Sequence, residues 1–161
     1  KAMTLKAAAD IGDHQHFERW FGGYHEAHAA KVRRNFKSVL GIIRSGQISM
    51  RCHQKSARGC QAGEFAFVYV RETYEINFCP SYFTLPTLAR LRPGETRSEH
   101  GSRAGTIIHE LSHFRSGGQT EDHCYARAVC AEMAQERPQR AIDNADSYQY
   151  FAEDVSHFGN R

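Results

Sequence analysis

The sequence predicts an α+β domain that is mainly helical and carries one small antiparallel sheet. Three observations support this fold class. Residues 25–43 repeat their apolar side chains with the period of an α-helix. Two segments rich in β-branched and aromatic residues, 65–70 and 74–79, are close enough in sequence to form an antiparallel hairpin. A second apolar helical stretch, residues 104–115, carries the pattern His-Glu-x-x-His.

The composition is that of a globular protein, and we expect residues 1–161 to form a single domain. Apolar residues make up 40% of the chain, and the net charge is +3. Lys and Arg are scattered among Asp and Glu, so no nucleic-acid partner is predicted. The apolar runs are too short for membrane insertion. Five Cys residues favour an oxidising compartment.

The elements of the first half follow in order. Residues 1–11 are rich in Ala and are predicted to be the end of a helix. The aromatic side chains of residues 14–24 are expected to anchor that segment on the core. The helix at 25–43 precedes a short strand near residues 48–50 and then the hairpin strands. Its buried side is predicted to consist of Ala29, Val32, Phe36, Val39, Leu40 and Ile43.

In the second half, Pro and Gly residues predict a loop over residues 80–102. The helix at 104–115 ends in a Ser-Gly-Gly-Gln turn, and a third helix is predicted over 120–136, where Pro138 stops it. Residues 139–144 are predicted to form a short helix or turn. A last helix follows, for which Asp146 is the candidate N-cap.

The apolar stretch at 104–115 contains His109, Glu110 and His113. On a helix the two His residues lie one turn apart on the same face, where their imidazoles can bind one tetrahedral zinc ion. Glu110 lies beside them, where its carboxylate can reach a water on the metal and act as general base of a hydrolysis. The pattern therefore predicts one catalytic Zn²⁺ as cofactor.

A catalytic zinc ion takes three protein ligands, so a third ligand is required. Metzincins have a His at the position of Gln119, and this class is therefore excluded. Asp122, His123 and Glu132 are the candidates, and Glu132 has the spacing of gluzincin aminopeptidases. Glu132 would lie roughly 15 Å beyond Asp122 on the predicted helix, so the two cannot share one metal without a bend.

Asp122 is favoured because it falls in the first turn of the predicted helix, where the helix dipole stabilises a carboxylate. The Gly117-Gly118 turn lets this helix start fold back toward the two His residues. Tyr125 would share the face of Asp122, and its hydroxyl can stabilise an oxyanion. Simpler roles also fit: a dipole partner or cap for Asp122 and a core aromatic for Tyr125.

Several segments of the chain resemble the aspzincin metallopeptidases, the group of deuterolysin and the peptidyl-Lys metalloendopeptidases. The resemblance runs from about Trp20 to about Asp154. The spacing of Asp122 and Tyr125 after the zinc motif is more specific than the motif itself. The similar segments are Trp20–Tyr24, Cys60–Tyr69, Gly105–His113, Gly117–Asp122 with Tyr125, and Asn144–Glu153.

This resemblance implies a zincin fold, a helical metallopeptidase catalytic domain with a small twisted sheet beside the cleft. It implies a disulfide between Cys60 and Cys79. Cys52 is then left without a partner, or pairs with Cys124 or Cys130, which would lie on different faces of one helix and are not expected to bridge each other. The implied roles are zinc ligation by His109, His113 and Asp122, general-base catalysis by Glu110 and oxyanion stabilisation by Tyr125.

In the Lys-specific members, two acidic residues near the C-terminus bind the substrate lysine that follows the scissile bond. Asp146 matches the first position, while Gln149 occupies the second. One carboxylate attracts an ammonium group less strongly than two, so strict lysine preference is not implied. A role for Asp146 as a helix cap alone fits the sequence equally well. The family also commonly has Gly after the Tyr, where this chain has Ala126.

The sequence thus predicts a secreted, monomeric zinc endopeptidase that hydrolyses proteins or peptides, with a preference for Lys or Arg on the amine side of the scissile bond. In a bacterium the periplasm is the alternative location. Two other functions stay open. One is a gluzincin-like aminopeptidase that uses Glu132 as ligand. The other is a non-catalytic zinc-binding interaction module, with His123 as the fourth ligand.

Overall fold

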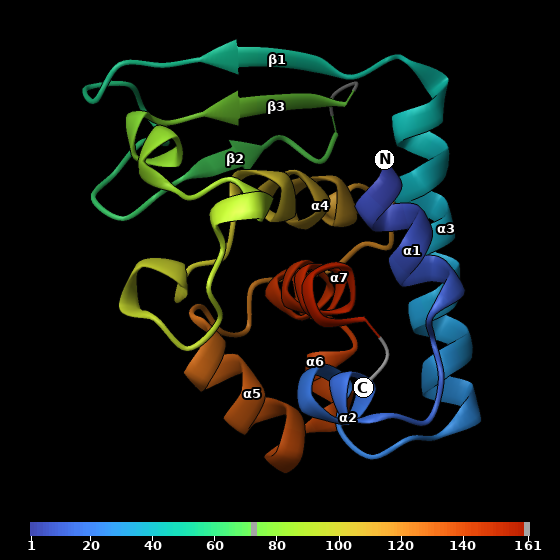
Figure 1. Ribbon diagram of the computed structural model, residues 1–161. Helices are drawn as coiled ribbons and strands as arrows, with labels where there is room; N and C mark the ends of the chain where they lie inside the picture. Colours follow the sequence, from blue (N-terminus) through green and yellow to red (C-terminus); the bar gives the residue numbers. More distant parts are fainter. Residues whose placement is uncertain (72–73, 160–161) are drawn as a thin grey trace.

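The computed structural model describes residues 1–71 and 74–159 (Figure 1). Residues 72–73 of the predicted hairpin connection and the last two residues of the predicted domain, 160–161, lie outside the described residues. The helices are α1 (Ala2–Ala9), α2 (Gln15–Phe21), α3 (Glu26–Ser45), α4 (Arg103–His113), α5 (Arg127–Glu136), α6 (Pro138–Ala141) and α7 (Ala145–Phe158). The strands are β1 (Ser49–Cys52), β2 (Ala66–Val68) and β3 (Glu75–Phe78), and the 3₁₀ turns are η1 (Pro80–Thr84), η2 (Leu88–Arg90) and η3 (Thr96–Ser98).

Helix α7 forms the centre of the molecule. It lies below α4, between α1 and α3 on one side and α5 on the other, and the sheet covers α4 from above (Figure 1). Residues 145–155 of α7 are all buried, and Tyr148 and Phe151 pack against Phe21 of α2 and Phe36 of α3. Aromatic contacts of this kind bury large apolar areas and account for the aromatic segment predicted to anchor on the core.

The sheet is mixed, so the prediction of a purely antiparallel sheet is wrong. Strands β2 and β3 pair antiparallel, as the hairpin predicts, but β1 pairs parallel with β3, giving the order β1-β3-β2. Strand β1 is exposed along its whole length. Its residues therefore do not alternate between buried and exposed, a pattern that would have indicated which strand β1 pairs with and in which direction.

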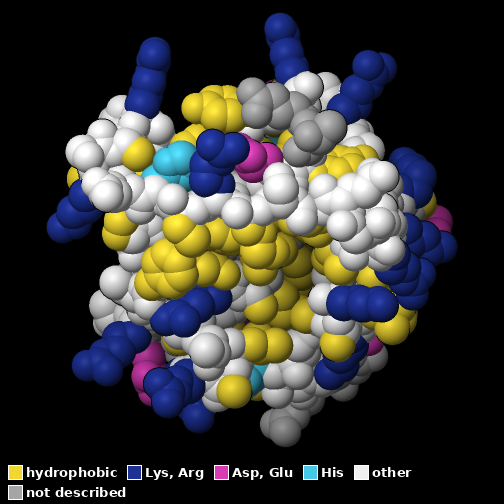
Figure 2. Space-filling view, turned by 90° about the horizontal axis from the view of Figure 1, so that it is seen from above, with side chains coloured by type: hydrophobic (Ala, Val, Ile, Leu, Met, Phe, Trp, Pro, Cys, Tyr) yellow, Lys and Arg dark blue, Asp and Glu magenta, His cyan; other side chains and the backbone are white. Residues whose placement is uncertain are grey.

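Seen from above, Lys and Arg side chains project mostly around the rim of the molecule, and apolar side chains gather over the middle of this face (Figure 2). The basic side chains are thus dispersed, as they are in the sequence. In the described part of the chain, no helix is both long enough and apolar enough to cross a membrane.

The close approach of α4 to α7 depends on Gly105. A Cβ atom at this position would lie 2.0 Å from Glu153 Oε1 of α7. Ser102 caps α4 by accepting a hydrogen bond from Gly105 N, and both its backbone N–H and its hydroxyl donate to Glu153. The start of α4 is therefore fixed directly on α7, and this sets the position of the His side chains further along α4.

The segment after α4 differs from the prediction of a helix over residues 120–136, because α5 begins only at Arg127. Glu121 instead forms a parallel β-bridge with Asn144, and the Asn144 side chain accepts hydrogen bonds from the backbone N–H groups of His123 and Cys124. These non-local hydrogen bonds pair backbone N–H and C=O groups that a helical turn would otherwise pair.

Two disulfides lie in the described residues. Cys60 pairs with Cys79, which fastens the loop before β2 to the end of β3. Cys124 pairs with Cys130, so the expectation that these two would not bridge is wrong. That expectation assumed one continuous helix, whereas Cys124 precedes α5 and is free to turn back on it. Cys52 is a free, exposed thiol in β1.

Candidate metal centre

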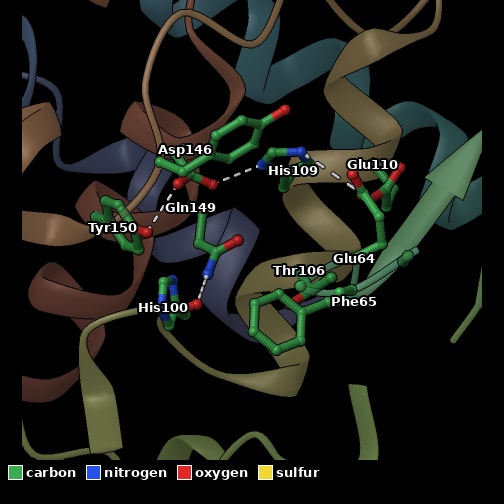
Figure 3. A pocket seen from close by; sticks show the side chains of 13 residues that line it. Glu64, Phe65, His100, Thr106, His109, Glu110, Asp146, Gln149 and Tyr150 are labelled. Carbon is green, nitrogen blue, oxygen red and sulfur yellow. Dashed lines mark hydrogen bonds and ion pairs between the residues drawn. The ribbon is translucent and has the colours of Figure 1, made fainter. Parts of the chain in front are cut away.

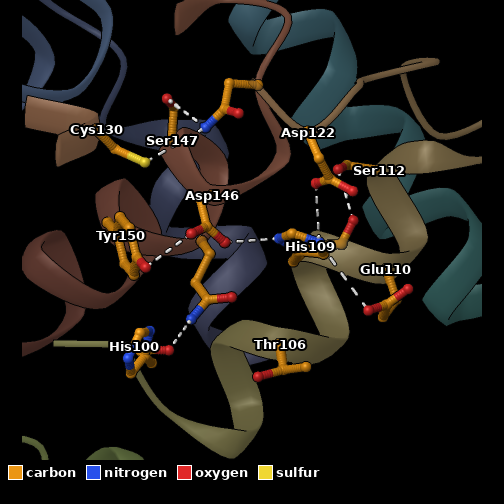
Figure 4. Close-up of polar contacts among 12 residues, drawn as sticks. His100, Thr106, His109, Glu110, Ser112, Asp122, Cys130, Asp146, Ser147 and Tyr150 are labelled. Atoms are coloured by element: carbon orange, nitrogen blue, oxygen red, sulfur yellow. Dashed lines mark hydrogen bonds and ion pairs between the residues drawn. The ribbon is translucent and has the colours of Figure 1, made fainter. Parts of the chain in front are cut away.

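Three side chains converge below the sheet. His109 and His113 come from α4, and Asp122 comes from the bridged segment between α4 and α5. Figure 4 shows Asp122 directed at His109. The Nε2 atoms of the two His residues are 3.1 Å apart. Asp122 Oδ1 lies 3.3 Å from His109 Nε2 and 3.5 Å from His113 Nε2.

These separations fit a tetrahedral zinc ion. With bonds of about 2.0–2.1 Å to nitrogen and oxygen, two ligand atoms at the tetrahedral angle are about 3.3 Å apart. The three measured edges, 3.1, 3.3 and 3.5 Å, scatter around that value. The side chains therefore form three corners of a coordination tetrahedron.

Hydrogen bonds at the opposite ring nitrogens orient both imidazoles. His109 Nδ1 is 2.7 Å from Asp146 Oδ1, and His113 Nδ1 is 2.9 Å from the carbonyl oxygen of Thr120. Because both Nδ1 atoms donate, both Nε2 atoms can turn a lone pair toward the centre. Tyr150 in turn donates to Asp146 Oδ2 at 2.8 Å, which fixes the carboxylate (Figure 4).

The centre favours positive charge. Burial alone would lower the pKa of His109, but the hydrogen bond and charge of Asp146, with the charges of Glu110 and Asp122, raise it to about 9. A divalent metal can supply the same positive charge as a proton at Nε2, and the two compete for this atom. The donor set thus fits zinc in its chemistry as well as its geometry.

Glu110 lies on α4 beside the triad, with Oε1 4.0 Å from His109 Nε2. It is 3% exposed. Burial raises its pKa to about 7, with His109 opposing the shift and Asp122 and Glu64 adding to it. A carboxyl group near this pKa can both accept and return a proton at neutral pH.

Tyr125 does not share a helical face with Asp122, because both residues precede α5. Its side chain is 57% exposed, so it is not a core aromatic. It nevertheless lines the same cavity as His109 and Glu110. Burial, with the charge and hydrogen bond of Asp122, raises the pKa of Tyr125. The next residue, Ala126, has φ 72° and ψ 143°, a conformation that favours glycine.

A cavity of about 280 Å³ opens beside the triad. Asp146, Gln149 and Tyr150 of α7 form one wall, while Glu64 and Phe65 before β2 form the opposite wall (Figure 3). Gln149 Nε2 donates to the carbonyl oxygen of His100 at 3.0 Å, which leaves Gln149 Oε1 to face the cavity (Figure 3).

The family model of the lysine-specific metallo-endopeptidases matches residues 6–153 of the chain. The chain belongs to this family, the aspzincins. The resemblance seen in the sequence is therefore confirmed, and it extends to nearly the whole chain. The three converging side chains, His109, His113 and Asp122, all lie within the matched residues.

Individual aspzincins and related proteins support this assignment. The chain is 33% identical to an extracellular protease of Aeromonas hydrophila over 148 residues, which are 92% of this chain but only 38% of that protein. It is 31% identical to a peptidyl-Lys metalloendopeptidase of Pleurotus ostreatus over 85% of this chain and 72% of that protein. The solved zinc peptidase from Grifola frondosa has the same fold, with a TM-score of 0.78, 24% sequence identity, and coverage of 96% of this chain and 88% of that one.

The other candidate ligands are not brought to the aspzincin triad. Glu132 is exposed on α5, and His123 Nε2 lies 3.8 Å from Glu121 Oε2 instead. Asp146 is not the N-cap of α7, so that alternative is wrong: Asn144 has the N-cap position, and the Asp146 carboxylate binds His109 and Tyr150. The capping prediction considered only backbone groups close in sequence, whereas the Asp146 carboxylate binds His109, which is 37 residues away.

Sequence reasoning missed three residues of the site. Tyr150 fixes Asp146, Arg127 lies 4.8 Å over the Tyr150 ring, and Glu64 lies in the cavity wall. Asp146 and Tyr150 are four residues apart on α7, and this spacing was the available signal for their contact. Glu64 offered no signal, since it lies in a loop whose position depends on the Cys60–Cys79 disulfide.

Proposed function

We propose that residues 1–161 form the catalytic domain of a secreted zinc metalloendopeptidase. The observation that carries the proposal is the set of three nitrogen and oxygen atoms at the edge lengths of a zinc tetrahedron. His109, His113 and Asp122 are the proposed ligands. Three protein ligands leave the fourth position to water or substrate, as in catalytic rather than structural zinc sites.

Bound zinc would polarise the scissile carbonyl and make water a nucleophile near neutral pH. Glu110 is the proposed general base and takes the proton of the attacking water at a carboxylate oxygen. It then gives this proton to the nitrogen of the leaving amine. Tyr125 donates a hydrogen bond to the oxyanion that develops on the carbonyl. Its exposure suits this role, because a substrate must reach the hydroxyl.

The cavity beside the triad is the proposed site for the substrate side chain on the amine side of the scissile bond. Asp146 and the Gln149 amide oxygen face it, which supports a preference for Lys or Arg. The names of the fungal relatives support Lys in particular. We further propose that the domain acts outside the cell as a monomer, and the two disulfides suit an oxidising compartment.

The aminopeptidase alternative is not favoured, because Glu132 is exposed and lies outside the cluster of ligand atoms formed by the described residues. The interaction-module alternative is not favoured either. A structural zinc site closes with a fourth protein ligand and has no use for a buried carboxyl group beside it.

Zinc content and peptide cleavage test the proposal together. Asp122→Ala should lose zinc and activity, while Glu132→Ala should keep both. Glu110→Gln should keep zinc and lose cleavage of denatured protein, and cleavage sites of the wild type can be mapped by mass spectrometry. Full activity in Glu110→Gln, or zinc loss in Glu132→Ala with zinc retained in Asp122→Ala, would contradict the proposal.

A further inference from the structure

The cavity beside the triad has two unlike walls. On the α7 side, Asp146 is 6% exposed, and its carboxylate already accepts hydrogen bonds from His109 and Tyr150. Gln149, on the same helix, contributes no charge. Among the acidic residues that line the cavity, Glu110 and Asp146 are buried, whereas Glu64 is exposed and comes from the opposite wall (Figure 3).

Glu64 is free to bind a ligand. Its side chain is exposed and makes no ion pair with the residues that the structure describes. Its backbone is held, because Glu64 N donates to the carbonyl oxygen of Gln61 and Glu64 O accepts from the hydroxyl of Ser81. The carboxylate is therefore carried into the cavity wall by a fixed piece of chain.

The cavity places Glu64 beside the catalytic centre. Its lining includes His109, Glu110 and Tyr125 as well as Glu64. No Lys or Arg lines the cavity among the described residues. A positive group that enters the cavity therefore meets the carboxylates of Asp146 and Glu64 on its two walls and no Lys or Arg side chain.

We propose that Glu64 is a specificity-determining residue, which supplies from the strand side the second carboxylate that selects a Lys side chain after the scissile bond. This inference rests on the proposed function and assigns that specificity to a further residue. The substrates it selects are polypeptides with Lys at this position.

The match between the acceptors and a Lys side chain supports the choice. An ammonium group has three N–H donors, and the cavity offers three acceptors of different origin: Asp146, Gln149 Oε1 and Glu64. Phe65, beside Glu64, provides an apolar surface for the methylene groups of the side chain. The planar guanidinium of Arg needs a paired acceptor in one plane, whereas these acceptors lie on facing walls.

The test compares two peptides that differ only in having Lys or its uncharged analogue norleucine after the scissile bond. Glu64→Gln keeps the shape of the side chain and removes its charge. Glu132→Gln, on the exposed face of α5, makes the same change in net charge away from the cavity and is the matched control. The quantity measured is the ratio of kcat/KM for the Lys peptide to that for the norleucine peptide.

We expect Glu64→Gln to lower this ratio about fivefold, the effect of one solvent-exposed charge at about 4 Å from the ammonium group. Glu132→Gln should leave the ratio unchanged, and Glu64→Gln with Gln149→Glu should recover part of it. In a Glu110→Gln background, calorimetry should show weaker binding of the Lys peptide, and unchanged binding of the norleucine peptide, when Glu64→Gln is added.

Two results would overturn the assignment while leaving the endopeptidase intact. One is a Lys preference that Glu64→Gln does not change. The other is an equal loss of rate on both peptides, which would mean that Glu64 acts on Glu110 and not on the substrate. A wild-type domain that holds zinc but cleaves neither peptide nor any denatured protein would instead overturn the proposed function, and the specificity role with it.

Discussion

Replacing Asp146 by Asn tests whether this residue orients the metal ligand His109. The Asp146 carboxylate accepts one hydrogen bond at each oxygen, from His109 Nδ1 at 2.7 Å and from the Tyr150 hydroxyl at 2.8 Å. An Asn side chain can keep Oδ1 toward His109 and turn its amide nitrogen toward the Tyr150 oxygen, which is able to accept. The substitution therefore removes the charge and keeps the geometry.

The expected loss follows from that difference. Hydrogen bonds to a charged group stabilise by roughly 1 kcal/mol more than neutral ones. Changes to the partner of a metal-binding His commonly weaken metal affinity about 10–100-fold. We therefore expect Asp146→Asn to weaken zinc binding about tenfold. Asp146→Ala, which also abolishes both hydrogen bonds, should approach a hundredfold, and Tyr150→Phe, which leaves the carboxylate in place, should cost less than tenfold.

Zinc affinity can be measured by competition with a chromophoric chelator, with circular dichroism as the control for folding. The expected order of affinity is wild type, Tyr150→Phe, Asp146→Asn, Asp146→Ala. The orienting role is refuted if Asp146→Asn binds zinc as tightly as the wild type. It is also refuted if Tyr150→Phe weakens binding more than Asp146→Asn does, because Tyr150 would then act without Asp146.

Other predictions concern the supports of the site. Gly105→Ala should lower the free energy of unfolding by about 1–3 kcal/mol, because the added Cβ atom would clash with Glu153. The control is Gly41→Ala on α3, which should not destabilise the protein, because no atom lies within 4 Å of its added Cβ. Thermal denaturation of the two variants tests this prediction. Ala126→Gly should raise stability by about 1 kcal/mol, since φ 72° is strained for Ala, and an unchanged melting temperature would contradict this. Burial raises the pKa of Glu153 to about 7, although Arg127 and Ser102 oppose the shift. The free energy of unfolding that this raised pKa contributes is fully present below pH 4.5 and is lost as the pH rises through 7. Between these pH values, the free energy of unfolding of Glu153→Gln, measured with denaturant, should therefore change less than that of the wild type.

The parts of the fold that the sequence predicted are those fixed by local pattern. Helix α3 repeats its apolar residues over five turns, and α4 carries its ligands one turn apart, so both could be placed within a few residues. The hairpin of β2 and β3 is also local. The position of Asp122 beside His109 and His113 was predicted by a resemblance in spacing and by a helix-dipole argument. The second argument failed because Asp122 lies outside α5.

The parts that could not be predicted depend on distant contacts. The bridge between Glu121 and Asn144 replaces the first turns of the predicted third helix. The parallel partner of β1 is β3, beyond the whole of β2 in sequence. Helical propensity at 120–126 is worth a few tenths of a kcal/mol per residue, which hydrogen bonds to the buried Asn144 side chain readily exceed.

The hydrogen bonds that Asp146 already makes give the reason for a second carboxylate at the cavity. Asp146 accepts the hydrogen bond of His109, which we propose orients that ring toward zinc, and the lone pairs used for that bond are less available to a substrate ammonium group. A substrate lysine bound by Asp146 alone would compete for the carboxylate and weaken its hydrogen bond to His109, and with it the orientation of the proposed zinc ligand. The Glu64 carboxylate has no such duty, because it forms no ion pair with the described residues and comes from the loop before β2. Dividing the two tasks between α7 and the strand side lets the cavity attract a cation without loosening the metal centre.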